Sequence, residues 1–159
     1  MMGGRQRLWR SHAPAHPAAC HARRVSASAA DLATETRKLY DGVALAEQAL
    51  ASGNADVENS AITKEAFADR IAAEILPALT LAQETWSAAA DAVSTDAENP
   101  ERSRYEDCSY AAGDLKNALA SRERWLRGAE GEVDTFGMYM DSFAILKPDC
   151  EAALGIPKG

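Results

Sequence analysis

The stretch YEDCSYAAGDLKNALASRERWLRGAEGEVDTFGMYMDSFAILKPDCEAAL, residues 105–154, decides the fold of this chain. Apolar positions in its first half recur at alternating spacings of three and four residues, which is the pattern of one helical face. These positions are Tyr105, Cys108, Ala112, Leu115, Leu119, the aliphatic stem of Arg122, and Leu126. Gly128 and Gly131 then interrupt the pattern. We therefore predict one helix that ends at a short glycine turn.

The same periodicity restarts after the turn and continues as far as Pro148. Its apolar positions are Val133, Phe136, Met140 and Phe143, with Tyr139 and Leu146 alongside. This second pattern predicts a second helix. Because the connection is short, we expect the two helices to pack antiparallel.

Two of the three cysteines lie in this stretch. Cys108 is 20 residues from Gly128, and Cys150 is 19 residues from Gly131, which corresponds to about 30 Å and 28 Å of helix. In an antiparallel pair the two cysteines reach the same height, so a Cys108–Cys150 disulfide is geometrically reasonable. Two buried free thiols that act as small hydrophobic groups satisfy the same spacing.

Upstream, two more segments have helical patterns. An amphipathic stripe begins at Asp31 and is expected to stop at Gly53-Asn54; it contains Leu32, Leu39, Val43, Ala46 and Leu50. The other upstream helix is expected to run from an N-cap at Ser60 to Val93, with a kink or break near Glu74. The kink is expected because Pro77 lacks a backbone donor and clashes with the preceding turn.

Asn99-Pro100 has the N-cap and first-turn proline that begin the helix containing Cys108. The chain is therefore predicted to be all-α. We expect an antiparallel up-and-down bundle with three core helices over residues 31–159. Three helices would leave one apolar seam exposed, and we predict that the amphipathic helix at 32–50 fills it.

The cysteine-bearing half resembles the plant invertase and pectin methylesterase inhibitor domain. The resemblance rests on Glu106-Asp107-Cys108, a helix carrying Tyr110, a glycine break, and Cys150-Glu151 followed by Leu154. The segment from Asp56 to Ser60-Ala61 resembles the opening of the family's first bundle helix. The resemblance spans roughly residues 34 to 154, and it implies that Cys108 and Cys150 are bonded to each other.

The chain departs from that family at both ends. The family's first disulfide has no counterpart, because the corresponding positions near Thr34 and Gly42-Val43 lack cysteine. The family also has a last helix of about 25 residues after the second cysteine, whereas this sequence ends at Gly159. A degraded, non-functional member of the family is therefore one alternative.

Charge is distributed unevenly along the sequence. Residues 1–30 contain five arginines, all three histidines and no acidic residue. The whole chain has 17 basic and 24 acidic residues, so the remainder carries 12 basic and 24 acidic residues, a net charge of −12. Such an acidic body is poorly suited to nucleic acid or an anionic membrane surface, so neither is expected as a partner.

Residues 1–30 are expected to be a disordered or targeting segment. Their arginine-rich, acid-free composition is typical of an organellar transit peptide, and they contain no apolar run that suits a secretory signal. The family resemblance instead implies an extracellular, apoplastic protein, and a disulfide requires an oxidising compartment. His12, His16 and His21 near Cys20 lack the spacing of a metal site.

No catalytic, cofactor-binding or metal-binding constellation is expected, so the chain is not predicted to be an enzyme. Histidine is confined to the N-terminal segment, so no Ser-His-acid or Cys-His arrangement can form in the core. Glu106-Asp107 and the pair Asp141 and Glu151 are interpreted as solvated acidic surface. Arg122, Arg124 and Arg127 are expected to pair with Glu123 and Glu130. Trp86, Trp125, Tyr139, Met138 and Met140 are expected to be core residues rather than ligand contacts.

The resemblance implies an enzyme inhibitor that covers the active-site cleft of a cell-wall enzyme in a one-to-one complex. The family's invertase-directed members carry a Pro-Lys-Phe tripeptide, and Val133-Asp134-Thr135 occupy that place here, after Gly131-Glu132. Pectin methylesterase is therefore the preferred target over invertase. The alternative from another class is a small organellar helical subunit of a larger assembly.

Overall fold

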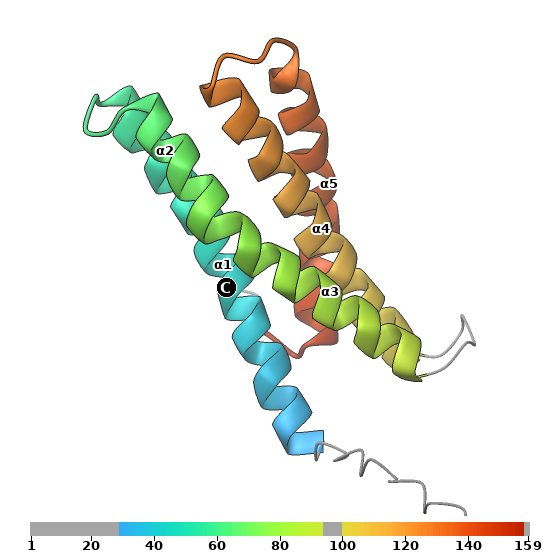
Figure 1. Cartoon of the computed structure of the whole chain (residues 1–159). Helices are drawn as coiled ribbons and strands as arrows, with labels where there is room; N and C mark the ends of the chain where they lie inside the picture. Colours follow the sequence, from blue (N-terminus) through green and yellow to red (C-terminus); the bar gives the residue numbers. More distant parts are fainter. Residues whose placement is uncertain (1–28, 94–99, 158–159) are drawn as a thin grey trace, which may run out of the picture.

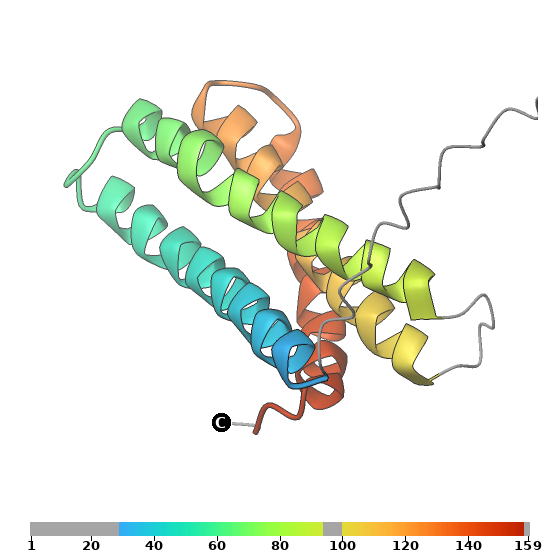
Figure 2. The ribbon, with the colours of Figure 1, turned by 60° about the horizontal axis from the view of Figure 1, so that its bottom comes forward.

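The computed structural model describes residues 29–93 and 100–157, and these residues form helices joined by short connections (Figure 1). The elements are α1 (Ala29–Glu58), α2 (Lys64–Arg70), the π-helical turn η1 (Ile71–Ile75), α3 (Leu76–Val93), α4 (Pro100–Leu126) and α5 (Glu132–Ala153). Because α2, η1 and α3 continue one another, the described residues form four rods that alternate in direction (Figures 1 and 2). The predicted all-α, antiparallel up-and-down bundle is confirmed.

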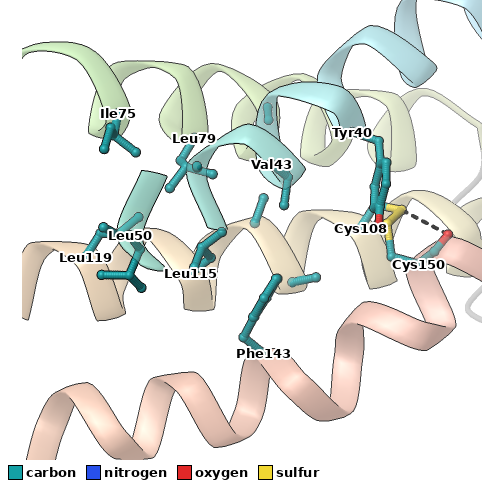
Figure 3. Close-up of a cluster of buried hydrophobic side chains, with 14 of the residues drawn as sticks. Tyr40, Val43, Leu50, Ile75, Leu79, Cys108, Leu115, Leu119, Phe143 and Cys150 are labelled. Carbon is teal, nitrogen blue, oxygen red and sulfur yellow. Dashed lines mark hydrogen bonds between the residues drawn. A yellow bond between two sulfur atoms is a disulfide. The ribbon is translucent and has the colours of Figure 1, made fainter. Parts of the chain in front are cut away.

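One apolar core joins all four rods (Figure 3). Its buried members include Val43 and Leu50 of α1, Phe67 of α2, Leu79 and Trp86 of α3, Leu115 and Leu119 of α4, and Phe143 of α5. Val43 and Leu50 are each only 4% exposed, and Leu39 packs against the same core. The prediction that the N-terminal amphipathic helix fills the open seam is therefore confirmed.

The helix α1 does not stop at Gly53-Asn54 as the sequence suggested. It continues to Glu58, and Gly53 lies inside it against the aromatic ring of Phe67. A Cβ atom at residue 53 would stand 2.0 Å from Cε2 of Phe67, far inside van der Waals contact. The glycine is therefore needed for the close approach of α2 to α1, and the prediction of a helix stop was wrong.

Ser60, which was predicted to be an N-cap, instead belongs to the motif that caps the C-terminal end of α1. Ser60 has a φ of 59°, and its N–H bonds to the carbonyl of Val57 while Ala61 N–H bonds to that of Asp56. These two bonds form a Schellman motif, which satisfies the last carbonyls of a helix. The N-cap of α2 is Thr63 instead, whose hydroxyl oxygen accepts a 3.1 Å hydrogen bond from Ala66 N–H.

The interruption expected before Pro77 takes the form of the π-helical turn η1. Leu76 N–H bonds to the carbonyl of Ile71, five residues back, immediately before the proline that cannot donate. The wider turn keeps the backbone bonded, so α2 and α3 remain one continuous rod. Ile71 and Ile75 both stay in the core.

Pro148 does not end α5, contrary to the sequence prediction. The helix continues to Ala153, and Leu154 N–H bonds to the carbonyl of Cys150. Pro148 is exposed, so the backbone acceptor it leaves without a helical donor faces the solvent side of the helix. The missing hydrogen bond is therefore tolerated at this position.

The apolar face predicted for α4 is buried, but the face predicted for α5 is only partly correct. Phe143 is 2% exposed and Met140 packs against the core, whereas Val133 and Met138 are each 57% exposed. Trp86 is a core residue as predicted, and its indole Nε1 has no hydrogen-bond partner within the described residues. Of the predicted N-terminal segment 1–30, residues 29 and 30 begin α1, and residues 1–28 lie outside the described residues, as do the predicted loop 95–98 and the Asn99 cap.

Candidate functional site

Cys108 and Cys150 form a disulfide that ties α4 to the last turns of α5 (Figure 3). Their Cα atoms are 4.6 Å apart across a separation of 42 residues. Both residues are buried, with exposed fractions of 0% and 2%. The two helices flanking the glycine turn thus form a covalently closed hairpin.

Acidic side chains surround this covalent link. The pKa of Asp107 is raised, first because the carboxyl group is partly buried, and then because Asp149 and Glu106 repel its charge. Glu106 forms an ion pair with Arg102, whose Nε donates a 2.7 Å hydrogen bond to it. The structure therefore brings Asp107 close to Asp149, a neighbour that the sequence pattern did not identify.

Asp141 and Glu151, which could be imagined as a second carboxylate pair, are not brought together. They are ten residues apart on α5, which corresponds to about 15 Å along the helix axis. Asp141 is exposed, whereas Glu151 accepts a hydrogen bond from the hydroxyl of Tyr40. No acid–base pair is formed by these two residues.

The Tyr40 hydroxyl begins a polar bridge between α1 and α5 beside the disulfide (Figure 3). Lys147 Nζ donates a 2.6 Å hydrogen bond to Glu47 and lies 4.0 Å from Glu151. The pKa of Tyr40 is raised strongly by burial and by the carboxylate of Glu151. Sequence reasoning missed this bridge, because its partners are 100 and 111 residues apart and follow no local pattern.

The arginines at the end of α4 form ion pairs, although not entirely with the predicted acids. Arg127 pairs with Glu123, as predicted, and also with Asp69 of α2 at 2.8 Å. Arg124 donates two 2.8 Å hydrogen bonds to Glu132, the first residue of α5, where the prediction named Glu130. The exposed Arg127 pairs add little stability, but they link α4 to α2.

Glu132 is held by two side chains of α4. Besides Arg124, the buried hydroxyl of Ser121 lies 2.5 Å from its carboxylate and 2.8 Å from its backbone carbonyl. The Arg124 bonds, followed by the Ser121 bond, lower the pKa of Glu132 to about 2. The carboxylate therefore stays ionised through the mildly acidic range and fixes the entry into α5.

Arg122 differs from its two neighbours. Its Nε donates a 3.0 Å hydrogen bond to the side-chain oxygen of Asn54 on α1. Its guanidinium carbon lies 4.3 Å from the ring centroid of Trp125 and 5.9 Å from that of Phe136. Trp125, predicted to be a core residue, is only partly buried and has the Nζ of Lys64 4.9 Å from its centroid.

In the part of the chain that the structure describes, no three His, Cys, Asp or Glu side chains form a group that could hold a metal ion. The three histidines and Cys20 lie outside that part. The described helices were also compared with the length and hydropathy that a membrane span requires, and none of them meets both.

Comparison with known proteins found no significant match. No protein family matches the sequence, and neither curated proteins nor solved structures give a significant match. The class of protein defined by the geometry alone is a disulfide-linked antiparallel helical bundle.

Proposed function

We propose that this chain is a proteinaceous enzyme inhibitor that binds its target one-to-one and performs no chemistry, as its resemblance to pectin methylesterase inhibitors implies. The observation that carries the proposal is the buried Cys108–Cys150 bridge between α4 and α5. This bridge joins the same two cysteines that the family resemblance implies are bonded. A covalently closed hairpin also holds its surface residues in place before binding, which lowers the entropic cost of association.

The fourth rod of the bundle distinguishes this chain from the family pattern. The resemblance implies a last helix after the second cysteine, whereas here α1, at the opposite end of the described chain, covers the core. The polar bridges of α1 to α5 and α4, through Tyr40 and Asn54, stabilise that arrangement. The inhibitory surface proposed here is therefore formed by α4 and α5, which the disulfide fixes, rather than by the rods that differ.

Pectin methylesterase is the favoured target and invertase the second. Val133 and Asp134, which stand in place of the invertase-directed tripeptide, are both exposed at the start of α5 and are available to a partner. The acidic body would be attracted to a basic enzyme through complementary potential. An apoplastic location follows from the same proposal, since the buried disulfide is suited to an oxidising environment.

A second candidate is a helical subunit of a larger assembly, and one observation favours it. Three of the exposed large apolar residues, Val133, Met138 and Ile145, lie on α5. A permanent partner that packed against α5 would bury them. This candidate differs from the inhibitor in compartment, because an organellar subunit would be expected to keep its cysteines reduced.

Enzyme inhibition by the purified oxidised chain tests the proposal directly. A basic plant pectin methylesterase is titrated with the full chain at low and at high ionic strength, and methyl-ester hydrolysis is followed by acid release. We expect inhibition that saturates at one chain per enzyme and weakens when salt is added. An acid invertase assayed in parallel is expected to respond less.

The chain with Cys108→Ser and Cys150→Ser provides a matched control, since it keeps the surface and loses the closed hairpin. Its inhibition is expected to be weaker than that of the oxidised protein. If the folded, oxidised chain leaves both enzymes fully active at every ratio, the inhibitor proposal is wrong and the subunit candidate gains.

A further inference from the structure

The Arg122 side chain is held rigidly at one end of the bundle. The guanidinium lies over Trp125, its own neighbour on α4, and near Phe136 of α5. Asn54 of α1 fixes its orientation by accepting the Nε hydrogen bond at 3.0 Å. Side chains from three rods thus position one cation. The hydrogen bond to Asn54 uses only the Nε–H of the Arg122 guanidinium, which has five N–H donors.

The charge of Arg122 is not neutralised by a direct ion pair. Burial lowers its pKa, and only the more distant Glu58 opposes that shift. Within residues 29–93 and 100–157, no carboxylate lies at ion-pair distance from Arg122, although Arg124 and Arg127 both have acidic partners. The remaining N–H donors of this partly buried guanidinium are therefore available to an anion.

A second cation lies beside the same indole ring. Lys64, the first residue of α2, has its Nζ 4.9 Å from the centroid of Trp125. It too has no direct ion pair in the described part of the chain. Two unpaired cations from different rods therefore converge on one aromatic side chain of a protein whose body is strongly acidic.

We propose that Arg122 and Lys64, oriented by Asn54 and Trp125, form a carboxylate-binding site at the end of the bundle. The planar edge of a guanidinium matches the two oxygens of a carboxylate, and stacking on an aromatic ring holds that edge in place. The ammonium of Lys64 contributes a second point of attraction. The carboxylate is supplied by an acidic peptide segment or by a small free carboxylic acid. This site does not depend on the inhibitor proposal.

Titration of the full, isotopically labelled chain tests the site by NMR. The probes are a capped tri-glutamate peptide, succinate, and a capped tri-glutamine peptide as the neutral control. The observed signals are the indole N–H of Trp125, assigned with Trp125→Phe, and the Nε–H of Arg122. We expect saturable shifts of both signals with a carboxylate probe and none with the tri-glutamine peptide.

Substitutions separate ligand binding from a purely structural role of the stacked arginine. Arg122→Gln is expected to weaken probe binding about tenfold or more, because a charge-assisted bidentate contact is lost. Arg122→Lys keeps the charge and the stem, and it is expected to bind more weakly because the planar fork is absent. Arg70→Gln removes an exposed arginine of α2 that pairs with Glu74, and it should leave binding unchanged.

The source of the carboxylate is distinguished by the two acidic probes. Saturation by the tri-glutamate peptide alone assigns the site to a peptide segment, and saturation by succinate as well assigns it to free carboxylates. The absence of saturable shifts with both probes overturns the proposal. Equal binding by the wild type and a folded Arg122→Gln or Arg122→Lys variant overturns it as well.

Discussion

The α4–α5 hairpin and the α1 rod are held in the bundle by different kinds of interaction. The hairpin is closed by the five-residue connection 127–131 and by a buried disulfide, and Ser121 and Arg124 fix the start of α5. The rod α1 has no covalent link to α4 or α5 and is held by apolar packing, Gly53 against Phe67, and a few polar bridges. The hairpin therefore rests on contacts close to its turn and bridge, whereas α1 depends on single long-range contacts.

The largest effect is expected from opening the hairpin. In the chain-entropy description, a bridge across 42 residues stabilises a folded chain by about 4 kcal/mol. Reduction, or Cys108→Ser with Cys150→Ser, should lower the free energy of unfolding by about that amount. Urea unfolding of the oxidised and reduced chains measures it. Equal unfolding midpoints would show that the packing of α4 on α5 is sufficient without the bridge.

The next effect concerns the close approach of α1 to α2. Gly53→Ala places a methyl group within 2.0 Å of the Phe67 ring, so we expect a loss of about 1–3 kcal/mol in unfolding free energy from overpacking. Gly42→Ala is the matched control in the same helix, because a Cβ at Gly42 meets nothing within 4 Å.

The control should stabilise the chain by up to about 1 kcal/mol, since alanine has a higher helix propensity than glycine. Thermal unfolding monitored by circular dichroism compares the two variants. If the Gly53→Ala protein is as stable as the Gly42→Ala protein, α1 can move away from α2 without loss of unfolding free energy. The packing of α1 would then be looser than that of the disulfide-linked hairpin.

A smaller effect is expected at the α1–α5 bridge. Tyr40→Phe keeps the ring but removes the hydroxyl that donates to Glu151, so about 1 kcal/mol of stability should be lost. Tyr110→Phe serves as the control, because that tyrosine is 59% exposed. Chemical denaturation of both variants is the measurement. If the two behave alike, packing rather than the polar bridge holds α1 in place.

The smallest effect is a dependence on pH at the covalent end of the hairpin. Because the pKa of Asp107 is raised above 3.8 in the folded state, ionising this carboxyl group destabilises the fold. Asp107→Asn should therefore increase the melting temperature at neutral pH. The increase should vanish as the pH falls below the ordinary range of aspartate, where the wild type also becomes neutral.

Melting curves of the wild type and of Asp107→Asn between pH 3 and pH 7 test this pH dependence. Asp141→Asn is the control, since Asp141 is exposed on α5 and its removal should leave the melting temperature nearly unchanged. An Asp107→Asn gain that persists at pH 3 would assign the effect to local packing instead of charge.

Three features could be predicted from the amino-acid sequence: the helical class, the turn at Gly128–Gly131, and the equal helix lengths that place Cys108 opposite Cys150. These features follow from periodicity and turn chemistry, which act between residues close in sequence. The contribution of Val43 and Leu50 to the core could be predicted for the same reason, because their stripe needed an apolar partner.

Other features depend on contacts that are visible only in the folded chain. Gly53-Asn54 resembles a helix stop in the sequence, but Gly53 lies inside α1 against the ring of Phe67. Pro148 is tolerated inside α5 because it faces solvent. The Tyr40–Glu151 contact and the placement of Arg122 and Lys64 around Trp125 join residues far apart in sequence. Such contacts depend on how close the side chains lie in the folded chain, and no local pattern in the sequence predicts that distance.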